Sequence, residues 1–419
     1  MVVSDISRRV YEMAEKAERS LAGQFARIDE IAAKNTAKVM SAFQRHRVSE
    51  ACFAGTTGYG YDDLGRDRLD EIYADVFGAE AALVRLNFVN GTHAITAALS
   101  ALCAPGETIL SINGAPYDTL RKAIGFGVEL EFGSLRFYGI NYAQTELLPD
   151  GSFDIKAIEK ALTEDSSVKA VIMQRSCGYE NRKTFTIDQI EEICRFIKSL
   201  RNDVSIFCDN CYGEFTAELE PTQVGADLIA GSLIKNPGGG IAPTGAYIAG
   251  RRELVERAAG RLTSPGIGGE CGSTLGNNRL LYQGFFIAPH VVAQALKTAC
   301  FAAEMMNQLG IESKPGPQEP RFDIIQRISI GSADGMKRFC AGIQAGAPVD
   351  SYVTPEPWAM PGYECEVIMA DGSFIQGSSI ELSADGPFRE PFNVFLQGGI
   401  TYESGKLGIM MAVENMIGE

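Results

Sequence analysis

The sequence predicts an α/β fold in which a mostly parallel sheet is covered by helices on both faces, followed by a smaller α+β domain. Apolar runs of strand length alternate with helix-like segments between residues 67 and 249, which is typical of a parallel sheet in a three-layer arrangement. After about residue 285 the alternation gives way to one helix, a proline-rich stretch and shorter strands. The 419 residues also exceed what one ordinary core accommodates. We therefore predict an N-terminal helical arm at 1–50, a large domain at 51–285 and a small domain at 286–419.

The N-terminal arm has apolar residues at helical spacing, among them Ile6, Val10, Met13, Leu21 and Phe25, with charged residues between them. This pattern predicts one or two amphipathic helices. An apolar stripe of this kind has to be buried against another surface. The sequence leaves open whether that surface belongs to a partner subunit or to the chain's own large domain.

The elements of the two domains follow from the positions of apolar runs and breakers. A helix and a strand are expected within 67–86, and Gly91 opens an apolar helix that ends near residue 102, before the Pro-Gly pair at 105–106. Further strands are predicted at 108–112, 168–173, 204–208, 227–230 and 245–249, with a helix at 187–200. In the small domain we expect a helix at about 291–309 and then short strands as far as about residue 411.

Composition narrows the functional class. A net charge of −15 disfavours general binding to nucleic acid or to an anionic membrane, because neutralising phosphates requires clustered Lys and Arg. The sequence has no run of about 20 apolar residues, and its start lacks the basic and apolar blocks of a signal peptide. The ten cysteines have no framework spacing, so we expect reduced thiols in a cytoplasmic protein. None of the three histidines is paired at metal-ligand spacing, so we expect no metal site.

Lys235 is the strongest candidate for catalysis. It follows the apolar run 227–230 and precedes a glycine-rich turn, so we expect low-dielectric surroundings that lower the pKa of its amine and make it a usable nucleophile or base. Upstream, the predicted strand 204–208 leads directly into Asp209. One lysine for an aldehyde and one acid for a ring nitrogen are what pyridoxal phosphate requires of a protein. On this segment alone, a solvent-exposed loop lysine remains the alternative.

Three further segments end strands or begin helices near the same predicted edge of the sheet. Gly91 and Thr92 stand at a helix start, where free backbone N–H groups and the helix dipole favour a phosphate. Tyr117 follows a strand and could offer its ring to a flat cofactor, although most such tyrosines only pack. Residues 174–176 (Gln-Arg-Ser) place polar groups at the carboxyl end of a strand, where ligands of open α/β sheets bind.

Taken together, these segments resemble the fold-type I pyridoxal phosphate enzymes, and most closely the trans-sulfuration group that includes methionine γ-lyase and the cystathionine lyases. The branch that the chain resembles is the methionine γ-lyase-like or "aluminium resistance" carbon–sulfur lyases. Its marks are the segments 58–66 (GYGYDDLGR), 208–215 (CDNCYGEF) and 397–403 (QGGITYE), together with the Tyr117 and Lys235 segments. The resemblance extends from about Gly58 to the end of the chain.

The resemblance implies a role for each matching residue. Lys235 would bind the cofactor aldehyde covalently, and Asp209 would pair with the protonated pyridine nitrogen. Tyr117 would stack on the ring and take part in catalysis. The phosphate would be held by Gly91, Thr92 and Ser232, and the loop with Tyr59 and Tyr61 would reach the phosphate of a neighbouring subunit. A homodimer or homotetramer with shared active sites is therefore implied.

The chain departs from the family pattern at two places. Ile234 stands where the usual motif has a hydroxyl residue before the lysine, and Gly60 and Tyr61 follow Tyr59 in place of the usual tyrosine–x–arginine. These departures imply rearranged phosphate contacts, and they prevent the substrate preference of methionine γ-lyase from being carried over. His93, beside the phosphate turn, is a second candidate for stacking or catalysis, although a structural role is favoured.

The predicted function is β- or γ-elimination on a sulfur-containing amino acid, giving a thiol, a 2-keto acid and ammonia. The substrate carboxylate needs a forked cation, and Arg389 after a small-domain strand is the candidate, with a surface pair to Glu390 as the equal alternative. Another pyridoxal phosphate reaction, such as transamination or aldol cleavage, remains open. So does a non-enzymatic nucleotide-binding or regulatory protein, although no dinucleotide fingerprint or Gly-Lys-Ser/Thr phosphate loop occurs.

Overall fold

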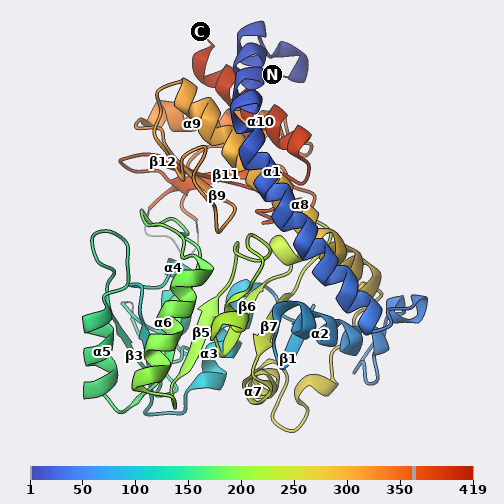
Figure 1. Cartoon of the computed structure of the whole chain (residues 1–419), viewed down its shortest axis with the longest axis vertical. Helices are drawn as coiled ribbons and strands as arrows, with labels where there is room; N and C mark the ends of the chain where they lie inside the picture. The colour runs from blue at the N-terminus through green and yellow to red at the C-terminus, as the bar shows by residue number, and fades with distance from the viewer. Residues whose placement is uncertain (1, 128, 361–364, 419) are drawn as a thin grey trace.

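The computed structural model describes residues 2–127, 129–360 and 365–418, which form a large and a small part stacked along the longest axis (Figure 1). The large part is built on a seven-stranded sheet of order β1-β7-β6-β5-β4-β2-β3. β7 runs antiparallel to both of its neighbours, and the other strand pairs are parallel. The strands are Ala81–Arg85 (β1), Thr108–Ser111 (β2), Asn141–Gln144 (β3), Val168–Gln174 (β4), Ser205–Asp209 (β5), Leu228–Ser232 (β6) and Ala246–Gly250 (β7). The mostly parallel sheet and its five predicted strands are therefore confirmed, with each end shifted by two residues or fewer.

Helices cover both faces of this sheet, as the apolar strands require. They are Leu64–Phe77 (α2), Gly91–Leu102 (α3), Asp118–Ile124 (α4), Ile155–Glu164 (α5), Ile187–Leu200 (α6) and Arg252–Leu262 (α7). One apolar cluster joins α3, α4 and α7 to one face of the sheet, through residues such as Leu99 and Phe207. A second cluster joins α2, α5 and α6 to the other face, through residues such as Ile190 and Ile206. α6 begins where Thr186 and Gln189 form a reciprocal capping box, a local signal that explains why its predicted range was right.

The small part contains a five-stranded antiparallel sheet of order β10-β11-β12-β9-β8. Its strands are Ser313–Lys314 (β8), Ile325–Ser329 (β9), Val367–Asp371 (β10), Ser383–Pro387 (β11) and Asn393–Gln397 (β12). The helix Ala333–Ala345 (α9) packs on β10 and β11, and Tyr402–Ile417 (α10) packs on α9 and on the helix Asn278–Gln308 (α8). This is the smaller α+β unit that the sequence predicts.

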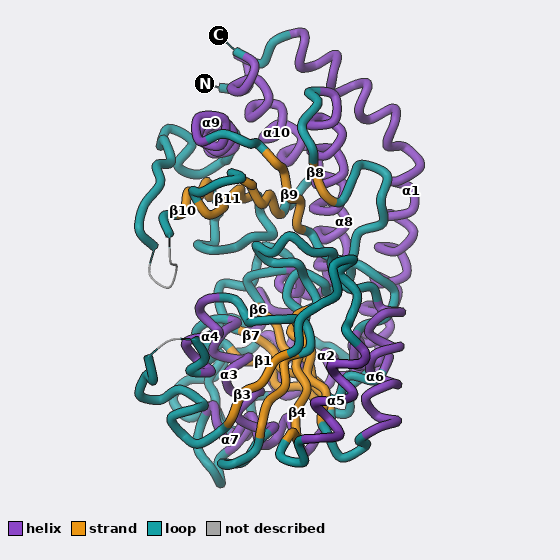
Figure 2. Tube along the Cα trace, turned by 90° about the vertical axis from the view of Figure 1, so that its left-hand side faces the viewer, coloured by secondary structure: helices purple, strands orange, loops and turns teal. Residues whose placement is uncertain are grey.

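Two long helices, α1 (Arg8–Arg45) and α8 (Asn278–Gln308), run side by side along both parts (Figures 1 and 2). The arm is thus a single helix that packs on the chain's own α8, α2 and α10, and its stripe of Val10, Ala14, Ala17 and Leu21 is buried. α8 starts well before the expected residue 291, so the predicted boundary at 285 falls inside a continuous helix. The division of the chain into domains at residues 50 and 285 stays a prediction.

The expected run of strands to residue 411 is wrong, because the last strand ends at Gln397 and helix α10 follows. Gly405 and Gly408 lower the helix propensity of this segment and hide it from sequence inspection. In the fold they allow close packing. A Cβ on Gly405 would stand 2.3 Å from Thr298 Oγ1 on α8.

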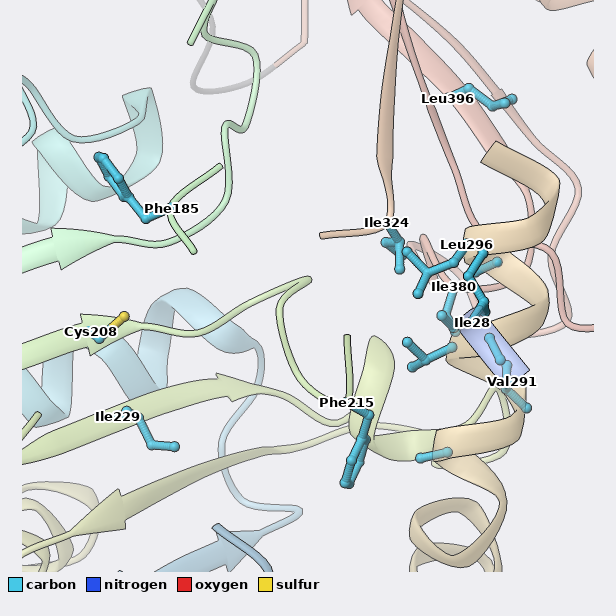
Figure 3. Close-up of a cluster of buried hydrophobic side chains, with 14 of the residues drawn as sticks. Ile28, Phe185, Cys208, Phe215, Ile229, Val291, Leu296, Ile324, Ile380 and Leu396 are labelled. Atoms are coloured by element: carbon cyan, nitrogen blue, oxygen red, sulfur yellow. The ribbon is translucent and has the colours of Figure 1, made fainter. Parts of the chain in front are cut away.

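The core is continuous between the two parts. Figure 3 labels members of one buried cluster that extends from the large sheet (Cys208 and Ile229) to the small part (Ile380 and Leu396). Within the described residues, α8 alone is long and apolar enough to cross a membrane, but 78% of its most apolar window is buried inside the fold. α8 is accordingly a core helix, and no membrane span is indicated.

Candidate active site

A cavity of about 470 Å³ opens at the carboxyl ends of the parallel strands, where the large part faces the small part. The large part contributes residues from the ends of β4, β5 and β6 and from the starts of α3 and α4. The small part contributes Ile325, Pro387, Arg389 and Gln397. This is the edge at which open α/β sheets bind ligands, and its volume suits a cofactor with a small substrate.

Lys235 and Asp209 meet in this cavity. Asp209 is the last residue of β5 and pairs in register with Ala230 of the parallel neighbour β6. β6 ends at Ser232, and Lys235 follows immediately before the 3-10 helix Asn236–Gly238. Both side chains line the same cavity. Two strand ends, separated in the sequence, therefore bring together the amine and the acid that the sequence singled out.

Asp209 is only 5% exposed, and its Oδ1 accepts a hydrogen bond from the backbone N–H of Cys211 at 3.1 Å. Burial raises the pKa of the Asp209 carboxyl, although the charge of Lys235 and the hydrogen bonds from Cys211 act in the opposite direction. A carboxylate in this position is stabilised by a positive charge that faces it.

Lys235 corrects one expectation. Burial does act to lower the pKa of its ammonium group, but Cys211, Tyr212 and Asp209 raise it, and their combined effect places the pKa well above its ordinary value. The expected low pKa is therefore wrong for this arrangement, because acidic groups lie on several sides of the amine. The sequence argument considered desolvation alone.

The start of α3 forms the second end of the cavity. Asn90 caps the helix by accepting a hydrogen bond from His93 N at 2.8 Å, which leaves the first N–H groups of the 12-residue helix directed into the cavity edge. Gly91 and Thr92 line the cavity together with Ser232. A Cβ on Gly91 would stand 3.3 Å from Ser232 Cβ, so glycine keeps the gap between α3 and β6 open. This is a cradle of the size and polarity that a phosphate needs.

Tyr117 stands just before α4 and lines the same cavity. Burial raises the pKa of its phenol well above the usual value, and Asp209 and Cys211 raise it further. A side-chain hydrogen bond with Thr92 and the charge of Lys235 act against that rise. The Tyr117 hydroxyl is thus a neighbour of the acid, the amine and the helix start at once.

Tyr59 and Tyr61 lie outside this cavity. Their side chains are 70% and 53% exposed, and the two rings stack on each other at 5.5 Å between centroids. Arg66 anchors the loop that carries the two tyrosines. Its guanidinium is 2% exposed and donates to the carbonyl oxygens of Gly60, Gly272 and Glu270. The arginine of this segment is therefore occupied with backbone, and the two tyrosines face outward.

Arg389 lines the cavity from the small part and is exposed at its rim. Within the described residues no ion pair joins it to Glu390. Its location at the cavity is compatible with binding a substrate carboxylate, and that role stays a prediction.

Two candidates from the sequence, Arg175 and His93, do not line the cavity. Gln174 and Ser176 line the cavity, but Arg175 points away and is fully buried, with its Nη1 3.2 Å from Glu220 Oε2. His93 accepts a hydrogen bond from Val89 N at 3.3 Å and packs edge-on against Phe88, and it does not line the cavity. Burial lowers the pKa of His93. A structural role fits both residues.

Tyr212 and Cys211 are site residues to which the sequence reading assigned no role. The Lys235 Nζ lies 3.9 Å from the centroid of the Tyr212 ring, and Cys211 lines the cavity between Asp209 and Gly91. Their closeness to Asp209 in the sequence was the available signal. Gln397 lines the cavity from the small part, and Tyr179 lines it from the loop after β4, where its ring lies 5.0 Å from that of Phe395 between centroids.

Comparisons with known proteins agree with this geometry. A family model described as methionine gamma-lyase matches residues 10–417. A solved structure described as a carbon–sulfur lyase involved in aluminium resistance, from Clostridium novyi, is 50% identical, with a TM-score of 0.95 over 98% of this chain and 97% of that one. The protein YnbB of Bacillus subtilis is 48% identical over 404 residues, 96% of each chain. The pyridoxal-5'-phosphate-dependent protein YhfS of Escherichia coli is 17% identical, with a TM-score of 0.61 over 91% of this chain and 95% of that one, which shows a common fold.

Proposed function

The chain belongs to the methionine gamma-lyase family, and we propose that it cleaves a sulfur-containing amino acid by β- or γ-elimination, releasing a thiol, a 2-keto acid and ammonia. The fold is that of the fold-type I pyridoxal phosphate enzymes, and the cofactor of the family is pyridoxal 5'-phosphate. Membership of the family makes the protein a pyridoxal phosphate-dependent lyase of the carbon–sulfur type. The bond that is cleaved and the amino acid that carries it are our proposal.

The residues of the cavity fit this cofactor. Lys235 supplies an amine for the aldehyde, and the cradle of Gly91, Thr92 and Ser232 suits the phosphate. The buried carboxyl of Asp209, whose pKa is raised mainly by burial, suits a protonated ring nitrogen, because a facing cation keeps such an acid ionised. Tyr117 completes the set with an aromatic ring beside these groups.

The chemistry divides between the cofactor and the chain. Pyridoxal phosphate supplies an electron sink that stabilises negative charge on the substrate α-carbon. Lys235 would bind the cofactor aldehyde and, when free, would be the base that removes the substrate α proton. Asp209 would hold the ring nitrogen in its protonated form. Arg389 at the rim binds and orients the substrate carboxylate with its forked donors.

The single observation that carries this proposal is that Lys235 and Asp209 line one cavity at adjacent strand ends. The test is to incubate purified protein with L-cystathionine, L-cysteine, L-homocysteine and L-methionine and to measure keto acid, ammonia and free thiol. We expect at least one substrate to yield all three products in equal amounts. Lys235→Ala abolishes this release and the visible absorption of lysine-bound cofactor, whereas Lys169→Ala, a lysine paired with Asp203 far from the cavity, retains both.

Two outcomes contradict the proposal. Retained keto-acid release in Lys235→Ala removes the lysine from the mechanism. Product formation that requires an added amino acceptor, with no ammonia released, identifies an aminotransferase.

We further propose that the active site is shared between two copies of the chain in a homodimer or homotetramer. The exposed, mutually stacked Tyr59 and Tyr61 support this, since two large aromatic rings stand in solvent on a loop that buried Arg66 holds in place. Aromatic residues of this kind are enriched at interfaces.

A further inference from the structure

Tyr212 lies over the amine of Lys235. The distance from Lys235 Nζ to the centroid of the Tyr212 ring is 3.9 Å, and both side chains line the cavity. An ammonium group over an aromatic face is attracted by the ring's quadrupole, and this attraction grows when water is excluded. The contact therefore favours the protonated form of Lys235 over the neutral one.

The backbone at Tyr212 is held in an unfavourable conformation. Its φ is +70°, a left-handed value that bulky side chains rarely adopt. Such an outlier persists only where the surroundings enforce it, and it is frequent at functional sites. The strain at Tyr212 is therefore a sign that the position of this ring matters.

A buried polar network enforces the turn that carries Tyr212. Arg175 Nη1 donates to Asn210 Oδ1 at 2.8 Å and lies 3.2 Å from Glu220 Oε2, and Asn210 Nδ2 donates to the same Glu220 oxygen at 3.0 Å. A Cβ on Gly213 would stand 2.5 Å from Arg175 Cδ, so the turn packs directly on the arginine. Arg175 was expected at the ligand-binding edge of the sheet. It instead supports the turn that places Tyr212 in the cavity.

Tyr212 also contacts the small part. Its hydroxyl lies 3.4 Å from Ser379 Oγ, in the segment between β10 and β11. Its ring packs against the small cluster of Cys177, Ile325 and Phe395, two of which belong to the small part. One side chain thus touches the reactive amine and the opposite wall of the cavity.

The titratable groups that act on Lys235 come from several elements. They are Asp209 at the end of β5, Cys211 and Tyr212 in the turn after it, Tyr117 before α4 and Asp385 on β11 of the small part. Burial lowers the pKa of Lys235, and Cys211 and Tyr212 are the largest contributions that raise it, Tyr212 in part through a hydrogen bond of its hydroxyl with the amine. Among these neighbours, Tyr212 is the one whose ring face covers the amine.

We propose that Tyr212 is a positioning residue for Lys235: its ring face holds and stabilises the ammonium that Lys235 becomes when it takes the substrate α proton. The part of this inference that concerns the substrate α proton rests on the proposed lyase function. The ring–amine contact itself does not, so it can be tested without any amino-acid substrate.

The test measures how fast the full-length, cofactor-free protein captures added pyridoxal phosphate, followed by visible absorption from neutral to alkaline pH. Only the neutral amine attacks the aldehyde, so the rate rises with pH and levels off near the pKa of Lys235. Tyr212→Gly removes the ring, and glycine accepts the positive φ without strain. Tyr212→Phe keeps the ring and removes the hydroxyl.

We expect Tyr212→Gly to capture the cofactor about tenfold faster at a fixed pH below the levelling point, and to level off about one pH unit lower. Tyr212→Phe keeps the ring face and loses only the hydrogen bond of the hydroxyl with Lys235, so its levelling point is expected to move clearly less than that of Tyr212→Gly. Phe395→Leu, which loosens the same apolar cluster from the small part, leaves the levelling pH unchanged. A merely structural loss would slow capture instead of accelerating it.

Three results in Tyr212→Gly would each overturn the inference: no change, slower capture, or an equal acceleration at every pH with the levelling point unmoved, which reports easier access. An equal shift in Tyr212→Phe would also overturn it, by assigning the effect to the hydroxyl. Because no amino acid is present, these results are independent of keto-acid release. A shifted levelling point in a protein that forms no keto acid would sink the proposed function alone.

Discussion

The guanidinium of Arg175 and the carboxylate of Glu220 form an ion pair at 3.2 Å in which neither side chain has any exposed surface. Glu220 also accepts hydrogen bonds from Phe215 N at 2.9 Å and Asn210 Nδ2 at 3.0 Å. The pair therefore fixes the turn that follows Asp209. A buried ion pair adds little net stability, because removing both charges from water costs about as much as their attraction returns. Removing one partner is nevertheless destabilising, because the remaining charge is then buried without a counter-charge.

Arg175→Met is expected to lower the free energy of unfolding by about 3–5 kcal/mol, because Glu220 stays buried and unpaired. Denaturant unfolding followed by circular dichroism measures this change. Arg19→Met is the matched control, since Arg19 pairs with Glu15 at 3.6 Å on the surface with 72% of its side chain exposed. The control is expected to change stability by less than about 1 kcal/mol. Equal effects of the two substitutions would contradict the assignment of the turn to this pair.

Asp209→Asn is expected to weaken cofactor binding by about 10- to 100-fold, because a hydrogen bond to a charged group is worth about 1.5–3 kcal/mol. The measurement is a titration of cofactor-free protein with pyridoxal phosphate by absorption or fluorescence. Asp70→Asn serves as the control, since Asp70 pairs with Arg85 at 2.8 Å away from the cavity. An unchanged affinity of Asp209→Asn for pyridoxal phosphate would contradict the proposed pairing of Asp209 with the ring nitrogen.

Glu214 makes stability depend on pH. Burial raises its pKa from 4.5 to about 8, so between these values the folded protein holds a proton that the unfolded chain has released. The free energy of unfolding contributed by this group therefore falls as pH rises from about 4.5 to about 8. Glu214→Gln keeps the shape and removes the titration. We expect its stability relative to the unsubstituted protein to increase with pH, by up to about 5 kcal/mol. Denaturation series at several pH values measure the difference, and parallel curves would show that Glu214 is ionised in the fold.

Two helical glycines make a matched pair. Gly405 on α10 has no room for a methyl group beside Thr298, whereas Gly23 on α1 has no heavy atom within 4 Å of where a Cβ would be. Gly405→Ala is expected to destabilise by about 1–3 kcal/mol through overpacking. Gly23→Ala is expected to stabilise by about 0.5–1 kcal/mol through helix propensity. Thermal unfolding of both variants tests the contrast, and stabilisation by Gly405→Ala would show that α10 can move away from α8.

Tyr59 tests the shared active site. If the loop reaches a neighbouring subunit, a mixture of inactive Tyr59→Ala and Lys235→Ala proteins forms hybrids with one site that contains neither substitution. After subunit exchange, an equal mixture is expected to recover about a quarter of the unsubstituted activity. Exchange is verified with differently tagged copies. Verified exchange without recovered activity would place Tyr59 and Lys235 in the same subunit's site or leave Tyr59 without a role.

Elements with complete local signals could be predicted from the sequence. The helix at 187–200 was predicted correctly because apolar residues recur with a period of 3.6 and the capping box of Thr186 and Gln189 marks its start. The strands were right because both faces of the sheet are buried, which makes them continuous apolar runs. Asp209 and Lys235 followed from the same strands, since ends of parallel neighbours share one edge.

Elements decided by packing could not be predicted in the same way. α10 depends on Gly405 meeting α8, a contact that propensity does not record. Arg175 was misplaced because side chains alternate along extended chain, so the residue between two cavity residues points to the opposite side. Tyr212 reaches Lys235 only through a left-handed backbone that distant residues enforce.

α8, which contains Pro289, contacts α2 of the large part and β9 and α10 of the small part, and this shared helix limits how the cleft can close around a ligand. A flexible connector would let the small part swing as a unit, whereas a helix shared by both parts and packed along α1 favours only slight sliding of interlocked side chains. The two walls of the cavity are therefore expected to keep nearly the same separation before and after a ligand binds, so that the shape of the opening contributes to ligand selection.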